Sequence, residues 1–205
     1  YLSKTMVMTI PIIMGAAMFR TIAVVCGDGM LGIWSADSDI YNFFYNWIYN
    51  AGYYFLPVYL GWAAAKQLGC SQPLGMMLGG VLIAPEFMTL VNAAADSGVT
   101  TTMVYGVLPA QLNNYSSTVL PMVLSMPVLM VVEKFMKKVV PDMLSTVFVP
   151  VGTMAVMIPV SLCALAPIGS ILGSMVGNFM FGLGNAGGIV TILSLVVIAA
   201  LWEFL

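Results

Sequence analysis

Residues 6–26 read MVMTIPIIMGAAMFRTIAVVC, an apolar run in which Arg20 is the one charged side chain. A helix needs about 20 mostly apolar residues to cross the hydrocarbon core of a bilayer. It must also satisfy every backbone amide within its own segment, since the hydrocarbon offers no partner. The run meets the length requirement, so it predicts a membrane-spanning helix at the start of the chain.

The rest of the chain has the same character. Of its 205 residues, 61% are hydrophobic and 7% are charged, whereas soluble domains carry roughly a quarter charged residues. Such a chain cannot cover itself with a polar surface, which excludes an ordinary soluble enzyme. Six Lys or Arg stand against eight Asp or Glu without a basic tract, so we expect no nucleic-acid partner.

Metal and cofactor chemistry have no support in the composition. The chain has no histidine, and its three cysteines, Cys26, Cys70 and Cys163, lie far apart in sequence. Neither a CxxC pair nor a Cys/His zinc site can therefore be formed from neighbouring residues. We expect no metal and no cofactor.

The fold class predicted from hydropathy is all-α, a polytopic membrane protein with about six transmembrane helices. The six apolar stretches are residues 6–26, 47–65, 74–95, 119–132, 144–166 and 189–205. Proline removes a backbone donor and bends or breaks a helix. We therefore expect Pro57 to disturb the second span and Pro85 the third. The less apolar stretch 97–117 is interpreted as an outer loop or a half-inserted segment facing water.

The charges predict an orientation, because Lys and Arg collect in short cytoplasmic loops. With the N-terminus in the cytoplasm, all basic loop residues fall inside and four loop aspartates fall outside. The inner set is Lys4, Lys66, Lys134, Lys137 and Lys138, and the outer set is Asp28, Asp37, Asp39 and Asp96. The sequence thus predicts a multi-pass protein of the cytoplasmic membrane.

Between the fourth and fifth stretches, residues 133–141 read EKFMKKVVP. Apolar residues alternate with Lys134, Lys137 and Lys138 at helical spacing, which predicts a short amphipathic helix with one basic face. We expect it to lie on the cytoplasmic surface of the bilayer, attracted by anionic headgroups and ended by Pro141. A partner-binding helix is the alternative interpretation.

Two charges fall well inside the predicted spans, Arg20 in the first and Glu86 in the third. Counted from the cytoplasmic ends, Arg20 lies about 14 residues in and Glu86 about 12, roughly 21 and 18 Å at helical rise. Charges at such depth cost a few kcal/mol unless they are paired or hydrated. We therefore predict an ion pair between Arg20 and Glu86; the alternative is that each charge points separately to water or to a subunit interface.

Gly75, Gly79 and Gly80 lie on one or adjacent faces of the third span, the first two four residues apart. Small residues at this spacing let helix backbones approach closely. The glycines predict a tight helix–helix contact.

Several strings, taken together and in order, resemble one family. They are YYFLPV (53–58), AAAKQLG (63–69), PLGMMLG (73–79), YSSTVLP (115–121), VEKF (132–135) and APIG (166–169). The chain is similar to the IIC permease domain of the bacterial phosphoenolpyruvate-dependent sugar phosphotransferase system. It most resembles the beta-glucoside and sucrose type of the glucose superfamily, over its N-terminal half.

The resemblance implies a homodimeric permease of the bacterial inner membrane that moves a sugar for coupled phosphorylation by IIB and IIA phosphoryl-carrier domains. It implies a dimer-forming membrane domain over residues 1–180 and the start of the sugar-binding domain over 181–205. The family's functional histidine and Gly-Ile-Thr/Ser-Glu motif are absent from these residues. We therefore expect the substrate-binding residues beyond Leu205, assign no catalytic residue, and expect that both ends of the chain are cut.

The chain departs from the family at one place. Family members often have His-Pro late in the third span, and this chain has Ala84-Pro85-Glu86. Cys70 stands in a Gly69-Cys70-Ser71 turn without the context of a IIB cysteine, so it is interpreted as a small turn residue. Two alternatives stay open: a truncated membrane scaffold without transport activity, and an unrelated secondary transporter.

Overall fold

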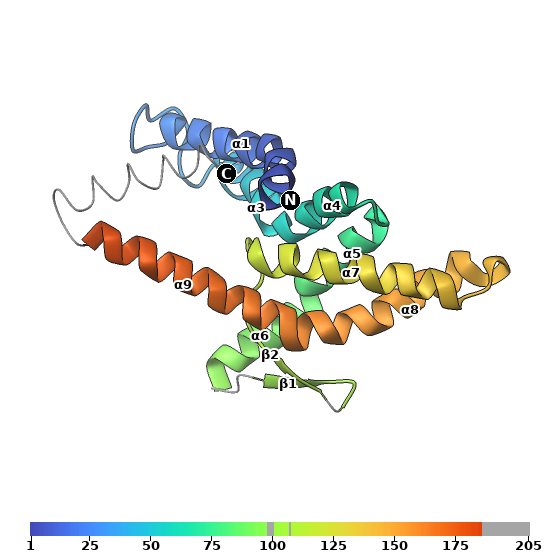
Figure 1. Ribbon diagram of the computed structural model, residues 1–205. Coiled ribbons are helices and arrows are strands. Elements are labelled where there is room, and N and C mark those ends of the chain that lie inside the picture. Colours follow the sequence, from blue (N-terminus) through green and yellow to red (C-terminus); the bar gives the residue numbers. More distant parts are fainter. Residues whose placement is uncertain (98–100, 107, 186–205) are drawn as a thin grey trace.

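The computed structural model describes residues 1–97, 101–106 and 108–185, which form an assembly of helices with one small two-stranded hairpin (Figure 1). The elements are α1 (Leu2–Cys26), α2 (Asp39–Asn42), the π-helix η1 (Phe43–Ile48), α3 (Tyr49–Tyr54), α4 (Leu56–Leu68), α5 (Gln72–Leu82), α6 (Pro85–Ser97), β1 (Thr101–Val104), β2 (Leu108–Gln111), α7 (Leu120–Val139), the 3₁₀ turn η2 (Asp142–Leu144), α8 (Ser145–Val160), the π-helix η3 (Ser161–Leu165) and α9 (Ala166–Asn185). The predominance of helix confirms the predicted fold class.

Helix α4 connects the two parts of the assembly. On one side α1 packs against η1, α3 and α4, and on the other α4 forms a hairpin with α5 and lies against α7. In turn, α7 contacts α8 and α9, which follow one another along the lower part of Figure 1. The N-terminal helices therefore reach the rest of the molecule chiefly through α4.

The core lies where α4, α5, α7 and α8 meet. Leu60, Leu78, Met122, Met126 and Met157 are fully buried there. Apolar side chains also cover much of the outside, and α1 in particular has only 17% of its most apolar stretch buried. A helix that is apolar all round is typical of a membrane span, because the outer face meets lipid.

The predicted count of about six spans is not confirmed. Three helical stretches of the described residues are long and apolar enough to cross a membrane: Leu2–Cys26, Gln72–Ala94 and Ser145–Phe179. All three correspond to predicted spans, at 6–26, 74–95 and 144–166, and the stretch from Ser145 extends the last of these well beyond its expected end. The stretch predicted at 189–205 lies outside the described residues.

The prolines act where the sequence predicted. Pro85 begins α6 directly after α5 has ended at Leu82, so the predicted third span is two helices. The predicted second span is likewise broken, since α3 ends at Tyr54 and Pro57 lies in the first turn of α4. Proline fits a first helical turn because the missing N–H would have no partner there.

The predicted separate amphipathic helix at 133–141 is wrong in one respect. Residues 133–139 are helical, but they form the last turns of α7 rather than a helix of their own. Pro127 lies inside α7 without ending it, and no glycine or proline follows until Pro141. The fourth span and the basic segment are therefore one continuous helix of 20 residues.

A hairpin that the sequence analysis missed lies in the predicted loop 97–117. Strand β1 pairs antiparallel with β2, with Thr101 opposite Gln111 and Val104 opposite Leu108. Tyr105 and Gly106 have positive φ at its tip. Threonine and valine are common in strands because branched side chains fit a pleated backbone.

The predicted glycine contact is confirmed for two of the three residues. A Cβ at Gly75 would fall within 3.0 Å of the Gly61 carbonyl group on α4, and one at Gly79 within 3.0 Å of Val58 and the Pro57 carbonyl. Gly80 has open space instead. The α4–α5 hairpin thus closes by direct backbone contact, with Gly61 as the unpredicted partner.

This contact predicts that Gly61→Ala and Gly75→Ala destabilise the protein by about 1–3 kcal/mol each, the usual cost of overpacking a tight contact. Thermal unfolding of the detergent-solubilised protein, followed by circular dichroism at 222 nm, measures the change. Gly80→Ala is the matched control and should be neutral or stabilise by up to about 1 kcal/mol, because alanine is the better helix former. Equal losses at all three positions would contradict the proposed contact.

Candidate functional site

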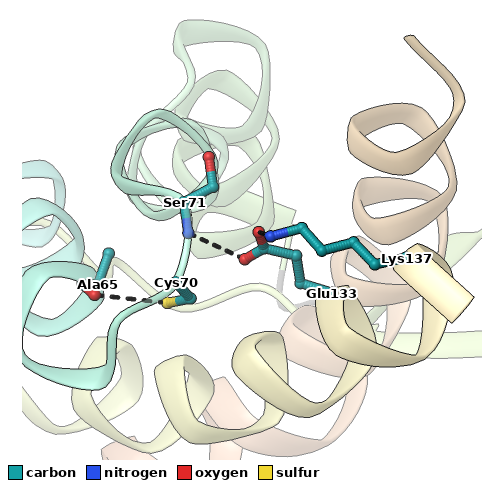
Figure 2. Close-up of polar contacts among 5 residues, drawn as sticks. All are labelled: Ala65, Cys70, Ser71, Glu133 and Lys137. Carbon is teal, nitrogen blue, oxygen red and sulfur yellow. Dashed lines mark hydrogen bonds and ion pairs between the residues drawn. The ribbon is translucent and has the colours of Figure 1, made fainter. Parts of the chain in front are cut away.

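Glu133 lies near the end of α7 and is a buried acidic residue, with 2% of its surface exposed. Figure 2 shows its carboxylate against the turn that joins α4 to α5. Oε2 accepts a hydrogen bond from the backbone N–H of Ser71 at 2.9 Å, and Oε1 lies 2.6 Å from Nζ of Lys137. A buried charge is tolerated when it is paired and hydrogen-bonded in this way.

The carboxylate lies at the start of a helix. Ser71 is the N-cap residue of α5, and the first N–H groups of a helix have no partner within it and carry partial positive charge. Gly69 ends α4 with φ of 67°, a left-handed conformation that glycine adopts without strain. The tight turn after Gly69 presents the Ser71 N–H to α7, so Glu133 links the α4–α5 hairpin to α7.

Cys70 lies in the same turn, with Sγ 3.7 Å from the carbonyl oxygen of Ala65 (Figure 2). Burial raises the pKa of the Cys70 thiol, the Glu133 carboxylate raises it further, and the ammonium groups of Lys137 and Lys134 act in the opposite direction. A thiol with a raised pKa is mostly protonated near neutral pH and is a poor nucleophile. This chemistry fits a turn residue and not a phosphoryl carrier.

A cleft of about 450 Å³ opens beside the carboxylate. Its polar lining comes from Ser71, Glu133, Lys137, Ser145 and Thr146, and its apolar lining from Leu74, Val149 and Pro150. Hydroxyls and an ammonium group of this lining can hold a hydroxylated or anionic group. Among the described residues, no group of three or more side chains could hold a metal ion. The arrangement therefore suits positioning or binding.

The structure brings Arg20 to tyrosines rather than to Glu86. Nη2 of Arg20 donates a hydrogen bond to the Tyr45 hydroxyl at 2.8 Å, and the guanidinium lies over the rings of Tyr45 and Tyr49. Glu86 is exposed in the first turn of α6. The ion pair that the structure shows among the described residues joins Glu133 to Lys137, and the predicted Arg20–Glu86 pair is not formed there.

The predicted basic residues Lys134, Lys137 and Lys138 are exposed on the last turns of α7. The start of α1 is joined to α7 nearer its beginning, because the Tyr1 hydroxyl donates to the carbonyl oxygen of Val123. From Val123 to Lys137 is about 21 Å along the helix. It stays a prediction that Lys4 and the lysines of α7 lie on the same side of the membrane. The cytoplasmic position of the N-terminus also stays a prediction.

Sequence reasoning quoted Glu133 only as part of a motif and missed its role. The signal available was the Glu133–Lys137 pair at i, i+4, a spacing that brings opposite charges together on one helix face. That spacing cannot reveal the third member, Ser71, which lies 62 residues away in sequence.

Comparisons with protein-family models and with solved structures find no match. Curated proteins do match along the chain. It is 32% identical over 209 residues to the mannose-specific EIIBCA component of the phosphotransferase system from Corynebacterium glutamicum, which covers 100% of this chain and 29% of that protein. It is 27% identical over 146 residues to the beta-glucoside-specific EIIBCA component of Halalkalibacterium halodurans, covering 67% of this chain and 23% of the relative.

A third relative is the arbutin-, cellobiose- and salicin-specific EIIBC component of Escherichia coli, 24% identical over 201 residues, which are 98% of this chain and 40% of the relative. The chain spans less than half the length of each of these three proteins. All three are sugar-specific EII components, and the apolar helices of this chain suit the membrane part of such proteins. The chain therefore belongs to the sugar-specific EII permeases of the phosphotransferase system, as a segment of their membrane-embedded EIIC part.

Proposed function

We propose that this chain forms part of the membrane pathway through which a phosphotransferase-system permease takes up a sugar for coupled phosphorylation. The observation that carries the proposal is the match of the whole chain to a mannose-specific EIIBCA component. The buried core around α4, α5 and α7, surrounded by exposed apolar surface, supports a structural part in a bilayer. The chain contributes scaffold and vestibule, with the sugar-binding residues beyond Leu205.

Within this proposal, residues 1–180 form the dimer-forming membrane domain and residues 181–205 begin the sugar-binding domain. Of the second segment, 186–205 lie outside the described residues. The exposed apolar face of α1 supports a contact with lipid or with a second copy. The location is the bacterial cytoplasmic membrane, with the N-terminus in the cytoplasm.

The proposed partners are IIB and IIA phosphoryl-carrier domains, because the relatives are single proteins that combine these domains with the membrane part. The proposed substrate is a sugar of the kinds named for the relatives, which include mannose, glucose, sucrose and beta-glucosides. A membrane scaffold without transport is the second candidate. The similarity to EII components argues against the alternative of an unrelated secondary transporter.

The cluster of Glu133, Ser71 and Lys137 has a structural role in this proposal. Its carboxylate fixes the turn at Ser71 to the end of α7, so the α4–α5 hairpin and α7 move together. A permease that alternates between states needs one rigid domain against which the other moves. The cluster holds that rigid domain together at the end where the lysines gather.

The function is tested in a chimera in which this chain replaces the aligned segment of the Corynebacterium glutamicum mannose-specific protein. Because the alignment covers the whole chain, we expect the chimera to retain phosphoenolpyruvate-dependent mannose phosphorylation, measured with radiolabelled sugar in membranes that contain the general carrier proteins. A chimera lacking the segment altogether is the negative control. A chimera that inserts and stays folded, as judged by its yield and size-exclusion profile, but does not phosphorylate sugar would favour the scaffold candidate.

The chain alone is expected to bind no sugar. Thermal unfolding in detergent with mannose, glucose, sucrose or salicin should show no saturable shift, whereas a ligand at 100 times its Kd would stabilise by about 2.7 kcal/mol. A full-length mannose-specific relative serves as the positive control. A saturable shift would place a sugar site within these residues while leaving the family role intact.

The charges around Cys70 predict opposite effects of two substitutions. In a Cys26→Ala, Cys163→Ala background, the pH midpoint for iodoacetamide alkylation should lie above that of a free thiol, because burial and Glu133 raise the Cys70 pKa. Glu133→Gln should lower this midpoint, and Lys137→Gln should raise it. Shifts of both variants in the same direction would point to local opening and would contradict the electrostatic account.

A further inference from the structure

Arg20 has more hydrogen-bond donors than partners. A guanidinium group has five N–H donors, and one of those of Arg20 is used by the Tyr45 hydroxyl. The guanidinium carbon lies 4.4 Å from the centre of the Tyr45 ring and 4.2 Å from that of Tyr49. In the described part of the chain no carboxylate lies within ion-pair distance of it. The charge is therefore held in place without a counter-charge.

The two tyrosines are themselves held in place. The Tyr45 ring stacks on Tyr41, with centroids 5.2 Å apart, and the Tyr49 ring stacks on Tyr53, with centroids 4.4 Å apart. Tyr45 belongs to the π-helix η1, a type of turn that is frequent at functional sites. The rings thus form a rigid wall that fixes the guanidinium before any ligand arrives.

A hollow of about 320 Å³ adjoins the guanidinium. Ala17, Thr21 and Val24 line it from α1, and Tyr49 closes one side. Residues 17, 20, 21 and 24 recur at helical spacing, so they share one face of α1. Thr21 and Val24 are exposed, which leaves the hollow open to whatever surrounds the helix.

The depth of Arg20 matches the level of lipid headgroups. The 25 residues of α1 span about 37 Å, a little more than the roughly 30 Å hydrocarbon core of a bilayer. Arg20 lies six residues from the end of α1 at Cys26, about 9 Å along the helix. Its long side chain can therefore reach the headgroup region while its backbone stays among acyl chains.

The same face of α1 continues as apolar surface toward the middle of the helix. Ile10 and Met14 are 47% and 57% exposed there. A soluble anion such as phosphate would leave this surface uncovered, whereas a lipid would place its acyl chain along it.

We propose that Arg20, with Tyr45 and Tyr49 as fixed walls, binds the phosphate group of a phospholipid whose acyl chain lies along α1 over Met14 and Ile10. Planar guanidinium groups recognise phosphate with two parallel hydrogen bonds, which a point charge does not provide. Free phosphate and a phospholipid would both present a phosphate group to Arg20, and the phospholipid is the proposed ligand. This inference does not depend on the sugar or the partners of the permease.

The test uses native mass spectrometry of the purified protein in mild detergent, titrated with dioleoyl-phosphatidylglycerol. Arg20→Gln should weaken lipid retention by about tenfold to a hundredfold, the range expected for loss of charge-assisted hydrogen bonds. Arg20→Lys should retain part of the binding, and Tyr45→Phe should weaken it less than Arg20→Gln. Lys66→Gln is the matched control, because Lys66 also lies over an aromatic ring, 5.4 Å from that of Trp62, and it should leave retention unchanged.

Circular dichroism of each variant checks that the helices persist, and Arg20→Lys keeps the test informative if Arg20→Gln does not fold. Equal retention by the wild type and both Arg20 variants would overturn the proposal. Displacement of the bound lipid by millimolar inorganic phosphate would identify a soluble anion as the ligand and would overturn the lipid source. The same spectra report the oligomeric state. If Arg20→Gln keeps its lipid but a dimer of the wild type is lost, the group that accepts hydrogen bonds from Arg20 belongs to a second copy of the chain, and the lipid proposal is overturned.

Discussion

The backbone contact between Gly61 and Gly75 is the constraint on which the rest of the packing depends. Helices in lipid gain little from hydrophobic burial against one another, because lipid tails are as apolar as leucine, so close van der Waals contact carries much of their association. The missing side chains bring α4 and α5 together and admit the methyl groups of Met122 and Met126 from α7. Since α1 also packs on α4, this contact positions both parts of the fold.

Two charges inside this apolar assembly are accommodated differently. Glu133 is buried, and both carboxylate oxygens have a partner within the chain. Arg20 lies at the surface of α1, where aromatic faces offset part of the cost of its charge without neutralising it. The first arrangement is complete within the chain and stabilises the fold. The second leaves donors that only a group from outside the described residues can satisfy, and for this reason the ligand inference rests on Arg20 and not on Glu133.

Local features of the fold could be predicted from the sequence and distant pairings could not. Pro85 and the glycines at 75 and 79 act through their own backbone, so their positions alone predicted a helix break and a close contact. The partners Gly61 and Ser71 depend on how the chain turns at Gly69, which hydropathy does not report. The basic segment at 133–141 was predicted as a separate helix because its hydrophobic pattern changes there, but a change of pattern without glycine or proline does not end a helix. The candidate site was therefore visible only as a motif until the structure brought Ser71 to Glu133.

Helix length alone also fails to count spans, as the segment from α8 to α9 shows. Its 35 residues from Ser145 to Phe179 would measure about 52 Å if straight, far more than a hydrocarbon core of about 30 Å. Pro159 and the π-turn η3 interrupt the regular hydrogen-bond pattern midway, and both are recognised causes of helix bending. Two contacts with α7 fix this region: the Ser161 hydroxyl lies 2.9 Å from that of Ser125, and Gly169 allows the backbone to meet Pro121. Both contacts fall in the first half of α7, so α7 fixes the position of η3 and of the start of α9. The number of times this segment crosses the membrane therefore depends on its packing against α7 and not on its apolar length alone.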